Sequence, residues 1–259
     1  MIAGEGRGTT AGVPPQGMPA AATVAWVSMP RGDTLEVLAV PLDETAAREG
    51  LLPDDLTARA SAWVAEAALR GEPAVTIPLY GTLVCWSGAR AAVVGPTDRL
   101  ERMRDAVLEF SALAHDLRGG ERELTAALRH VDDDAGLAFE FDERAVPRRS
   151  ELAQRFRQAV SIRRRLVEMA PAVHRPALHP PTLASQIGER LRERTRLAER
   201  LEFAGQQAEL LERVYEGCGQ RASDFMLARR QTMLEWTIIV LLAAETIVLV
   251  VELLASRRG

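Results

Sequence analysis

A long hydrophobic segment near the C-terminus constrains this chain more than any other feature. Residues 234–254 read LEWTIIVLLAAETIVLVVELL, and as a helix they would span about 31 Å, close to the thickness of a bilayer's hydrocarbon core. Residues 236–254 hold 12 Ile, Leu or Val side chains, which favour insertion by roughly 4–7 kcal/mol. A charged Glu near the centre opposes insertion by about 3 kcal/mol. We therefore predict one transmembrane helix over residues 233–254, a single-pass C-terminal anchor in the inner (cytoplasmic) membrane.

Acidic residues make this segment more than a plain anchor. Glu245 and Glu252 are seven residues apart and share one helix face. Because a carboxyl inside a membrane is costly unless it is neutral or paired, this face is expected to meet a helix of another subunit. Trp236 and the basic tail, residues 255–259, suit the two membrane interfaces. The alternative is a buried helix of a soluble bundle, which would tolerate Glu235 and the other two carboxyls better.

The N-terminus guides the expected location of the rest of the chain. Residues 1–20 are rich in Gly and Pro and show no basic segment followed by an apolar one, so a disordered tail rather than a secretory signal is expected. The bulk of the protein is accordingly predicted to lie in the cytoplasm. The absence of Lys and Asn is typical of a GC-rich, bacterial genome.

Residues 183–232 carry a second periodic pattern. From Leu197 to Phe225 apolar residues recur at alternating spacings of four and three, which predicts a long helix with the seam of a coiled coil or of a helical hairpin. We expect this seam to join identical subunits. Two glycines, Gly217 and Gly219, leave open either a kink or a close approach of two helices. The seam residues expected to mediate assembly are Leu197, Leu201, Leu211, Tyr215 and Phe225.

Residues 21–143 read as an α/β-type domain, so the whole chain is assigned to the α+β class with long helices following. Short runs rich in Val, Leu and Trp predict strands, and residues 56–70 form an amphipathic helical pattern. A helix starting near Thr97 is expected to end before a break at Gly119-Gly120. One more strand is predicted near residues 137–141.

Charge is distributed unevenly between the blocks. Residues 1–143 hold 12 Arg and 23 acidic residues, whereas residues 144–200 hold 14 Arg and 5 acidic residues. Residues 144–170 predict an Arg-rich helix, followed by a Pro-rich linker over residues 171–182. This block either binds phosphates of RNA or the ribosome, binds anionic lipid headgroups, or pairs with the acidic block. Its candidate binding residues are Arg155, Arg157, Arg163, Arg164 and Arg165.

Two short motifs resemble a known family. One is Arg230-x-x-x-Leu234-Glu235-Trp236, which leads into the apolar run and Glu245; the other is the stretch YGTLVCWSG at residues 80–88. Together they resemble the meiotic nuclear division family (RMND/RMD type), a domain-of-unknown-function family with a C-terminal membrane helix. The chain would be a divergent bacterial member. The resemblance implies an oligomeric, membrane-attached protein without known catalytic residues, and a role near ribosomes by analogy.

No motif in the sequence specifies a reaction, a metal site or a cofactor. The sequence therefore predicts a membrane-anchored oligomeric scaffold rather than an enzyme. One alternative is an enzyme with a site around His130 and Asp132–Asp134, where three consecutive carboxylates cannot all face one site. The other is an oligomeric pore lined by Glu245.

Overall fold

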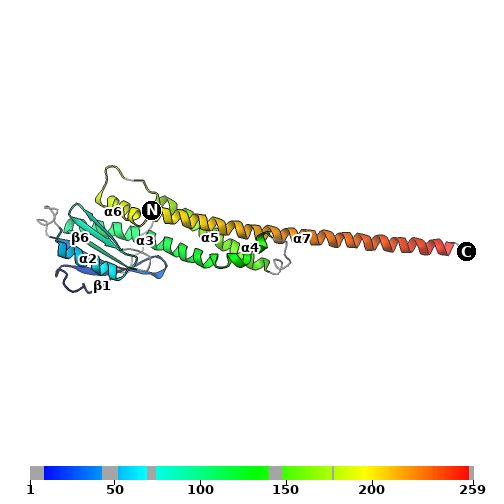
Figure 1. Ribbon diagram of the computed structural model, residues 1–259, viewed down its shortest axis with the longest axis horizontal. Helices are drawn as coiled ribbons and strands as arrows, with labels where there is room; N and C mark the ends of the chain where they lie inside the picture. The colour runs from blue at the N-terminus through cyan, green and yellow to red at the C-terminus, as the bar shows by residue number, and fades with distance from the viewer. Residues whose placement is uncertain (1–8, 43–51, 69–73, 140–147, 177, 257–259) are drawn as a thin grey trace. The chain divides into compact units, whose positions relative to one another are not determined.

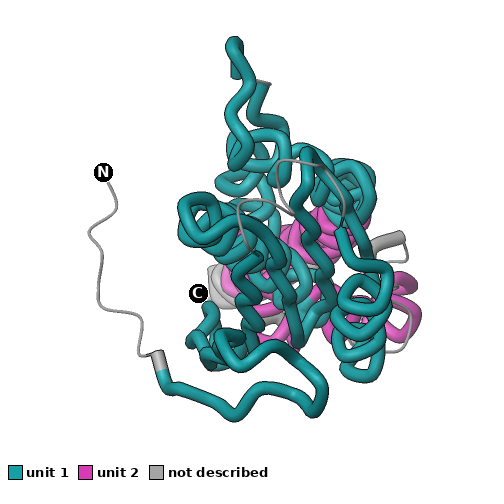
Figure 2. Tube along the Cα trace, turned by 90° about the vertical axis from the view of Figure 1, so that its left-hand side faces the viewer, with its two compact units in different colours: residues 1–123, 162–206 teal, residues 124–161, 207–259 magenta. Residues whose placement is uncertain are grey.

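The computed structural model describes residues 9–42, 52–68, 74–139, 148–176 and 178–256. The chain divides into two compact units, shown in different colours in Figure 2. Unit 1 comprises residues 1–123 and 162–206, and unit 2 comprises residues 124–161 and 207–259. Figure 1 labels the helices α2 to α7 and the strands β1 and β6. Three helices, α3, α5 and α7, contribute residues to both units.

Unit 1 contains a six-stranded sheet in the order β1-β2-β3-β6-β5-β4. Two antiparallel three-stranded meanders meet where β3 and β6 pair in parallel. Parallel pairing requires a crossover, and the helix α2 (Asp54–Glu66) lies in the connection between the meanders. The strands are β1 (Thr9–Gly12), β2 (Thr23–Ser28), β3 (Thr34–Leu42), β4 (Val75–Leu79), β5 (Thr82–Trp86) and β6 (Arg90–Pro96).

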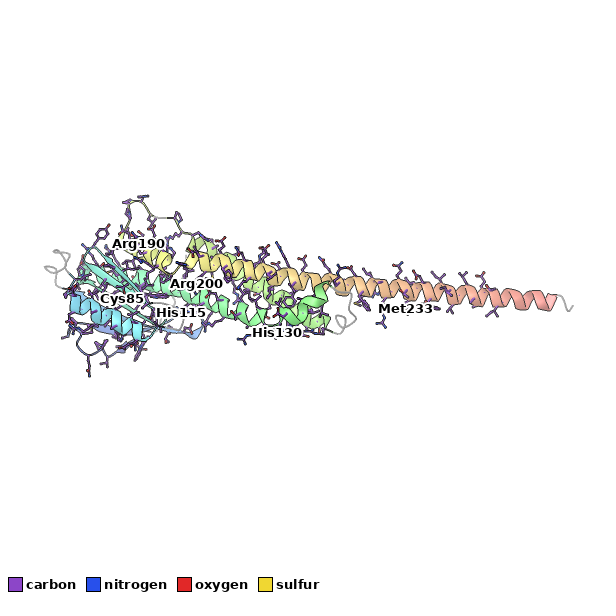
Figure 3. All side chains as sticks on the ribbon, in the orientation of Figure 1. Cys85, His115, His130, Arg190, Arg200 and Met233 are labelled. Atoms are coloured by element: carbon purple, nitrogen blue, oxygen red, sulfur yellow. The ribbon has the colours of Figure 1, made fainter. Side chains whose placement is uncertain are left out.

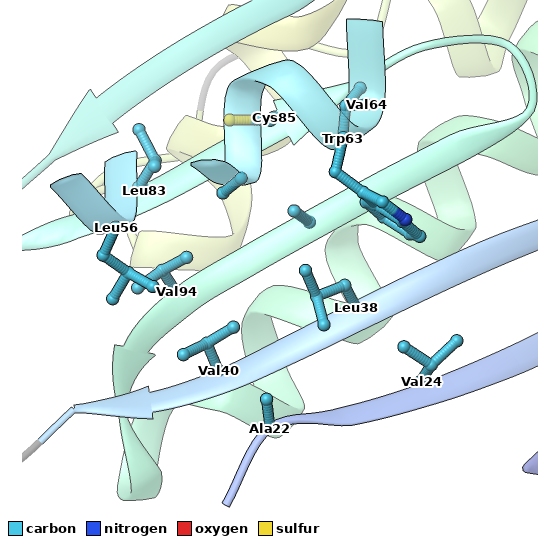
Figure 4. Close-up of a cluster of buried hydrophobic side chains, with 12 residues drawn as sticks. Ala22, Val24, Leu38, Val40, Leu56, Trp63, Val64, Leu83, Cys85 and Val94 are labelled. Carbon is cyan, nitrogen blue, oxygen red and sulfur yellow. The ribbon is translucent and has the colours of Figure 1, made fainter. Parts of the chain in front are cut away.

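Helix α2 covers one face of this sheet (Figure 4). Its apolar residues Leu56, Ala60, Trp63 and Val64 are buried, as the helical spacing predicts. They pack on alternate residues of β2, β3, β5 and β6, because successive strand residues point to opposite faces. At the edge of this layer the Arg90 guanidinium lies 4.7 Å from the centre of the Trp63 ring, in a cation–π contact.

The opposite face of the sheet packs against α3 (Thr97–Leu128). The indole nitrogen of Trp86, in β5, donates a 2.9 Å hydrogen bond to the Ser111 hydroxyl on α3. The Trp86 ring also meets Phe110 edge to face, with centroids 5.0 Å apart. Both faces of β5 and β6 are therefore covered, which explains why these strands read as continuous apolar runs without alternation.

The remaining parts of unit 1 are held to α3 by ion pairs. Arg165, on α5 (Arg149–Val173), donates to Glu123, and Arg200, on α7 (Leu197–Ser256), donates to Glu121 at 2.6 and 2.9 Å. Between α5 and α7 in the sequence lies α6 (Leu183–Arg194). Its N-terminus is capped by reciprocal hydrogen bonds between Thr182 and Ser185. This capping box fixes the start of α6 at Leu183, where the sequence predicts that a helix begins.

Unit 2 is a small helical bundle. Its apolar core joins α4 (Val131–Phe139), the first part of α5 and the middle of α7. The end of α3 packs against the same cluster. The buried members of the core are Leu137, Leu152, Ala159, Leu211, Val214, Tyr215 and Cys218.

Several boundaries predicted from the sequence are wrong. The break at Gly119-Gly120 does not occur, because α3 continues to Leu128. These glycines instead permit close packing: a Cβ on Gly119 would lie 2.5 Å from the Arg31 guanidinium, and one on Gly120 would lie 3.4 Å from Leu166. The strand predicted near residues 137–141 is also wrong, since Leu137 lies in α4 and residues 140–147 lie outside the described residues.

Two further differences concern the ends of the predicted segments. Strand β1 lies within the stretch predicted to be a disordered tail, because its residues pair with β2. Residues 183–232 do not form a single helix. The chain leaves the helix after Arg194, and Arg196 has a positive φ of 50°. From Leu197 to Ser256 the helix is then unbroken, so Gly217 and Gly219 produce no break.

Candidate functional site

The C-terminal part of α7 exposes its apolar side chains. Figure 3 shows the side chains of this part of the helix, among them Met233. The described residues contain one helix long and apolar enough to cross a membrane, and none of its most apolar 18-residue window is buried. Trp236, Glu235 and Glu245 are all exposed. Glu252 lies in the helical backbone, but its side chain is outside the described set.

The predicted assembly seam has a different role from the one expected. Leu211 and Tyr215 pack in the core of unit 2, and Leu197 and Leu201 are buried as well. Because these four side chains are already buried within one chain, they are not available to pair with a second copy. Phe225 is half-buried. The prediction that Leu197, Leu201, Leu211 and Tyr215 join two subunits is therefore wrong. These four residues form a seam that packs within one chain.

A buried carboxylate lies at the centre of unit 2. Asp134, on α4, is fully buried and contacts guanidinium groups of Arg148, at 2.7 Å, and of Arg155. The hydroxyl of Tyr215 lies 3.2 Å from the same carboxylate, and the Cys218 thiol lies 3.5 Å from the Asp134 backbone oxygen. Four side chains from α5, α7 and the residue before α5 thus surround one acidic residue. We call these five residues the Asp134 cluster.

Burial and charge change the titration of two members of this cluster. Burial raises the pKa of the Tyr215 phenol, and the nearby negative charge of Asp134 raises it further. The pKa of the Cys218 thiol is raised for the same two reasons. Both groups are thereby held in their neutral forms, which disfavours a nucleophilic thiolate. The cluster is better suited to hold helices together than to activate a nucleophile.

The other residues of the alternative enzyme site do not join this cluster. His130, Asp132 and Asp133 are exposed, and only Asp134 of the three consecutive carboxylates turns inward. Among the described residues no group of three His, Cys, Asp or Glu side chains has the arrangement of a metal site. The burial of Asp134 could have been read from helical spacing, since Val131, Asp134 and Leu137 recur every three residues.

The candidate arginines of α5 divide into two groups. Arg155 and Arg165 are half-buried and form ion pairs with Asp134 and Glu123. The donated hydrogen bonds from Arg165, and then those from Arg31, hold the pKa of Glu123 below its usual range. Three arginines remain exposed on α5: Arg157, Arg163 and Arg164.

Exposure does not leave all three arginines equally available. Arg164 lies 3.5 Å from Glu168, one helical turn further along. Such exposed pairs within a helix contribute little free energy and dissociate readily. The structure thus places Arg155 and Arg165 in ion pairs with Asp134 and Glu123, and the side chains of Arg157, Arg163 and Arg164 at the surface.

No protein-family model matches this chain, and neither a curated protein nor a solved structure matches it. The resemblance to the meiotic nuclear division family therefore stays a hypothesis that rests on two short motifs.

Proposed function

We propose that this protein is a membrane-anchored oligomeric scaffold, with unit 1 and the bundle of unit 2 on the cytoplasmic side of the inner membrane. The exposed arginines of α5 bind an acidic partner, which we propose to be RNA of a ribosome-associated assembly. No catalytic step is part of this function, because the Asp134 carboxylate is occupied by donors from Arg148, Arg155 and Tyr215.

The continuity of α7 is the observation that carries this proposal. One unbroken helix is buried in the bundle as far as Cys218 and then presents an exposed apolar surface. A surface of this size in water would cost free energy over its whole length. Insertion into a bilayer removes that cost, and a helix satisfies its backbone hydrogen bonds internally.

Helix geometry favours RNA over lipid as the partner of the α5 arginines. Within unit 2 the start of α5 packs at the level of Tyr215, which is 19 residues before Leu234. Nineteen residues of helix span about 28 Å, several times the distance over which salt screens charge. If α7 enters the membrane near Leu234, the lipid headgroups therefore lie too far from Arg157 to bind its guanidinium group. Arg229 and Arg230 lie within two turns of the apolar span and are better placed to meet them.

Alkaline carbonate washing of native membranes tests the anchor. The full chain should stay in the membrane pellet, whereas a chain that ends at Arg230 should be released into the supernatant. A full chain that is washed off as readily as the shortened one would rule out the anchored scaffold.

RNA binding is tested separately with the detergent-solubilised full chain. Replacing Arg157, Arg163 and Arg164 by Gln should weaken RNA binding and reduce its salt dependence, by about two in the log–log slope if three phosphate contacts are lost. Arg99→Gln with Arg102→Gln is the control, since these residues are exposed on α3. An RNA partner would be contradicted if the triple variant and the control lost RNA binding equally. It would also be contradicted if the unmodified chain bound no RNA at low salt.

A further inference from the structure

Beyond its buried part, α7 carries a second apolar stripe. Four branched aliphatic residues recur at intervals of seven, and each side chain is between 56% and 64% exposed. They are Leu227, Leu234, Leu241 and Val248. A repeat of seven with Leu at one position matches the d position of a two-stranded coiled coil, which is half of the heptad pattern. The preceding a positions hold Asp224, Gln231, Ile238 and Glu245, of which Ile238 is the apolar one.

This stripe lies on the side of α7 that faces away from the bundle of unit 2. Cys218 is the last fully buried residue of the seam, and Leu227 follows nine residues later. Nine residues at 100° each turn the helix by about 180° beyond two full turns. Two copies can therefore approach along the second stripe while the bundle of each copy stays on its outer side.

The partner must run beside α7 both in water and in the membrane. Leu227 precedes the apolar span by seven residues, whereas Leu241 and Val248 lie within it. The described residues of this chain contain one helix apolar enough for the membrane, so they supply no second span to cover the stripe. A second copy presents the same residues at the same depths. Two copies inserted by the same route also have the same direction, which makes the pair parallel.

Charges beside the stripe match a parallel pair. With Leu at d, Arg230 occupies a g position and Glu235 the e position five residues later. In a parallel coiled coil the g residue of one helix lies beside that e residue of the other, so the two carry opposite charges. Both residues are exposed, and within its own chain Glu235 accepts a hydrogen bond of 3.5 Å from Gln231.

We propose that α7 pairs in parallel with α7 of a second copy through Leu227, Leu234, Leu241 and Val248, with Arg230 of each copy paired to Glu235 of the other. This pairing rests on the proposed membrane anchoring. It places Glu245 of each copy at the axis of the pair, opposite the same residue and away from the lipid. The cost of a carboxyl in the apolar layer is thereby reduced.

Cysteine crosslinking in native membranes tests the face of the helix. Leu227→Cys should form disulfide-linked dimers under mild oxidation about tenfold faster than Arg229→Cys, because only the former brings two Cβ atoms within disulfide distance. Arg229 is the matched control, since it lies two residues on and about 200° around the helix. The unmodified chain gives the background from Cys85 and Cys218, which are buried. Equal rates for the two variants would overturn the proposed face.

Charge exchange tests the register. In the Leu227→Cys background, Arg230→Glu or Glu235→Arg alone should slow crosslinking several-fold, and the two changes together should restore it. Single changes without effect, or a double variant no faster than the singles, would overturn the parallel register.

Carbonate washing of the same membranes separates this inference from the anchor. If the chain is washed off, both the anchor and the pairing fail. If the chain stays in the pellet and the crosslinks do not follow the stripe, the anchor stands and the pairing alone is wrong.

Discussion

The hydroxyl of Tyr215 on α7 lies 3.2 Å from the carboxylate of Asp134 on α4, although 81 residues separate the two in the sequence. Two arginines donate to the same carboxylate, one of them Arg155 on α5. The Asp134 cluster therefore ties three helices of unit 2 together in the bundle from which the proposed membrane helix extends.

Removing the phenolic hydroxyl should weaken this attachment modestly. Tyr215→Phe deletes one hydrogen bond to a charged group, which typically contributes about 1.5–3 kcal/mol, while the two arginines still satisfy the carboxylate. We expect a free energy of unfolding lower by about 1–2 kcal/mol in denaturant titrations of the full chain in detergent. Tyr80→Phe is the control, because Tyr80 is 71% exposed and should give no change. Equal effects of the two substitutions would contradict the assigned hydrogen bond.

Breaking the ion pair should have a larger effect. Arg155→Met leaves the fully buried Asp134 carboxylate short of a cation, and loss of one partner of a buried pair costs about 3–5 kcal/mol. Arg148 remains, so the lower end of that range is expected. The exposed Arg157→Met should change the free energy of unfolding by less than about 0.5 kcal/mol. The ion pair has no stabilising role if both variants unfold at the same denaturant concentration.

Acid should weaken the contact between α5 and α3 in unit 1. Arg165, and less strongly Arg31, lower the pKa of Glu123. A lowered pKa means that the folded state binds fewer protons, so this stabilisation is complete above the unfolded pKa, near 4.3, and is lost as pH falls through the folded value. Glu123→Gln should therefore destabilise the chain at neutral pH, with a difference from the unmodified protein that shrinks as pH falls below about 4.

Thermal unfolding at a series of pH values measures this difference. Glu101→Gln, at an exposed position of α3, serves as the control and should give no pH-dependent difference. A Glu123→Gln effect that is independent of pH would contradict the assigned pairing.

Both cysteines should be unreactive in the folded protein. Burial raises the pKa values of Cys85 and Cys218 and also excludes reagent. Because a raised pKa keeps the folded thiols protonated, the associated stability is present below the unfolded thiol pKa and is lost as pH rises through the folded values. A colorimetric thiol assay at pH 8 should detect both thiols only after denaturant is added, and rapid labelling of either in native conditions would contradict its burial.

The unbroken path of α7 through its glycines can be tested by adding a methyl group. A Cβ on Gly219 would meet nothing within 4 Å, so Gly219→Ala should raise the free energy of unfolding by about 0.5–1 kcal/mol through helix propensity. A Cβ on Gly119 would displace the Arg31 guanidinium, which pairs with Glu123 at 2.5 Å. Gly119→Ala should accordingly show no gain. Destabilisation by Gly219→Ala in denaturant titrations would show that the helix bends there.

Local patterns in the sequence determined much of unit 1. The strands Val75–Leu79 and Thr82–Trp86 lie in short apolar runs of the kind that predicts strands, and the buried face of α2 follows from its helical spacing. The alternating spacing from Leu197 to Cys218 also identified the buried side of α7. These features are set by side-chain periodicity, which needs no knowledge of the partner. The exposed apolar span after Leu234 follows from composition alone.

Tertiary structure alone decided what each pattern packs against. The seam of α7 is covered by α4 and α5 of its own chain, and a periodic pattern does not state which helix will cover it. Gly119 and Gly120 continue a helix because they lie against Arg31 and Leu166, which are distant in the sequence. Asp134 alone of three adjacent carboxylates is buried, because the arginines and Tyr215 that satisfy it come from other helices. Propensity is local, whereas burial and ion pairing depend on residues that only the folded chain brings together.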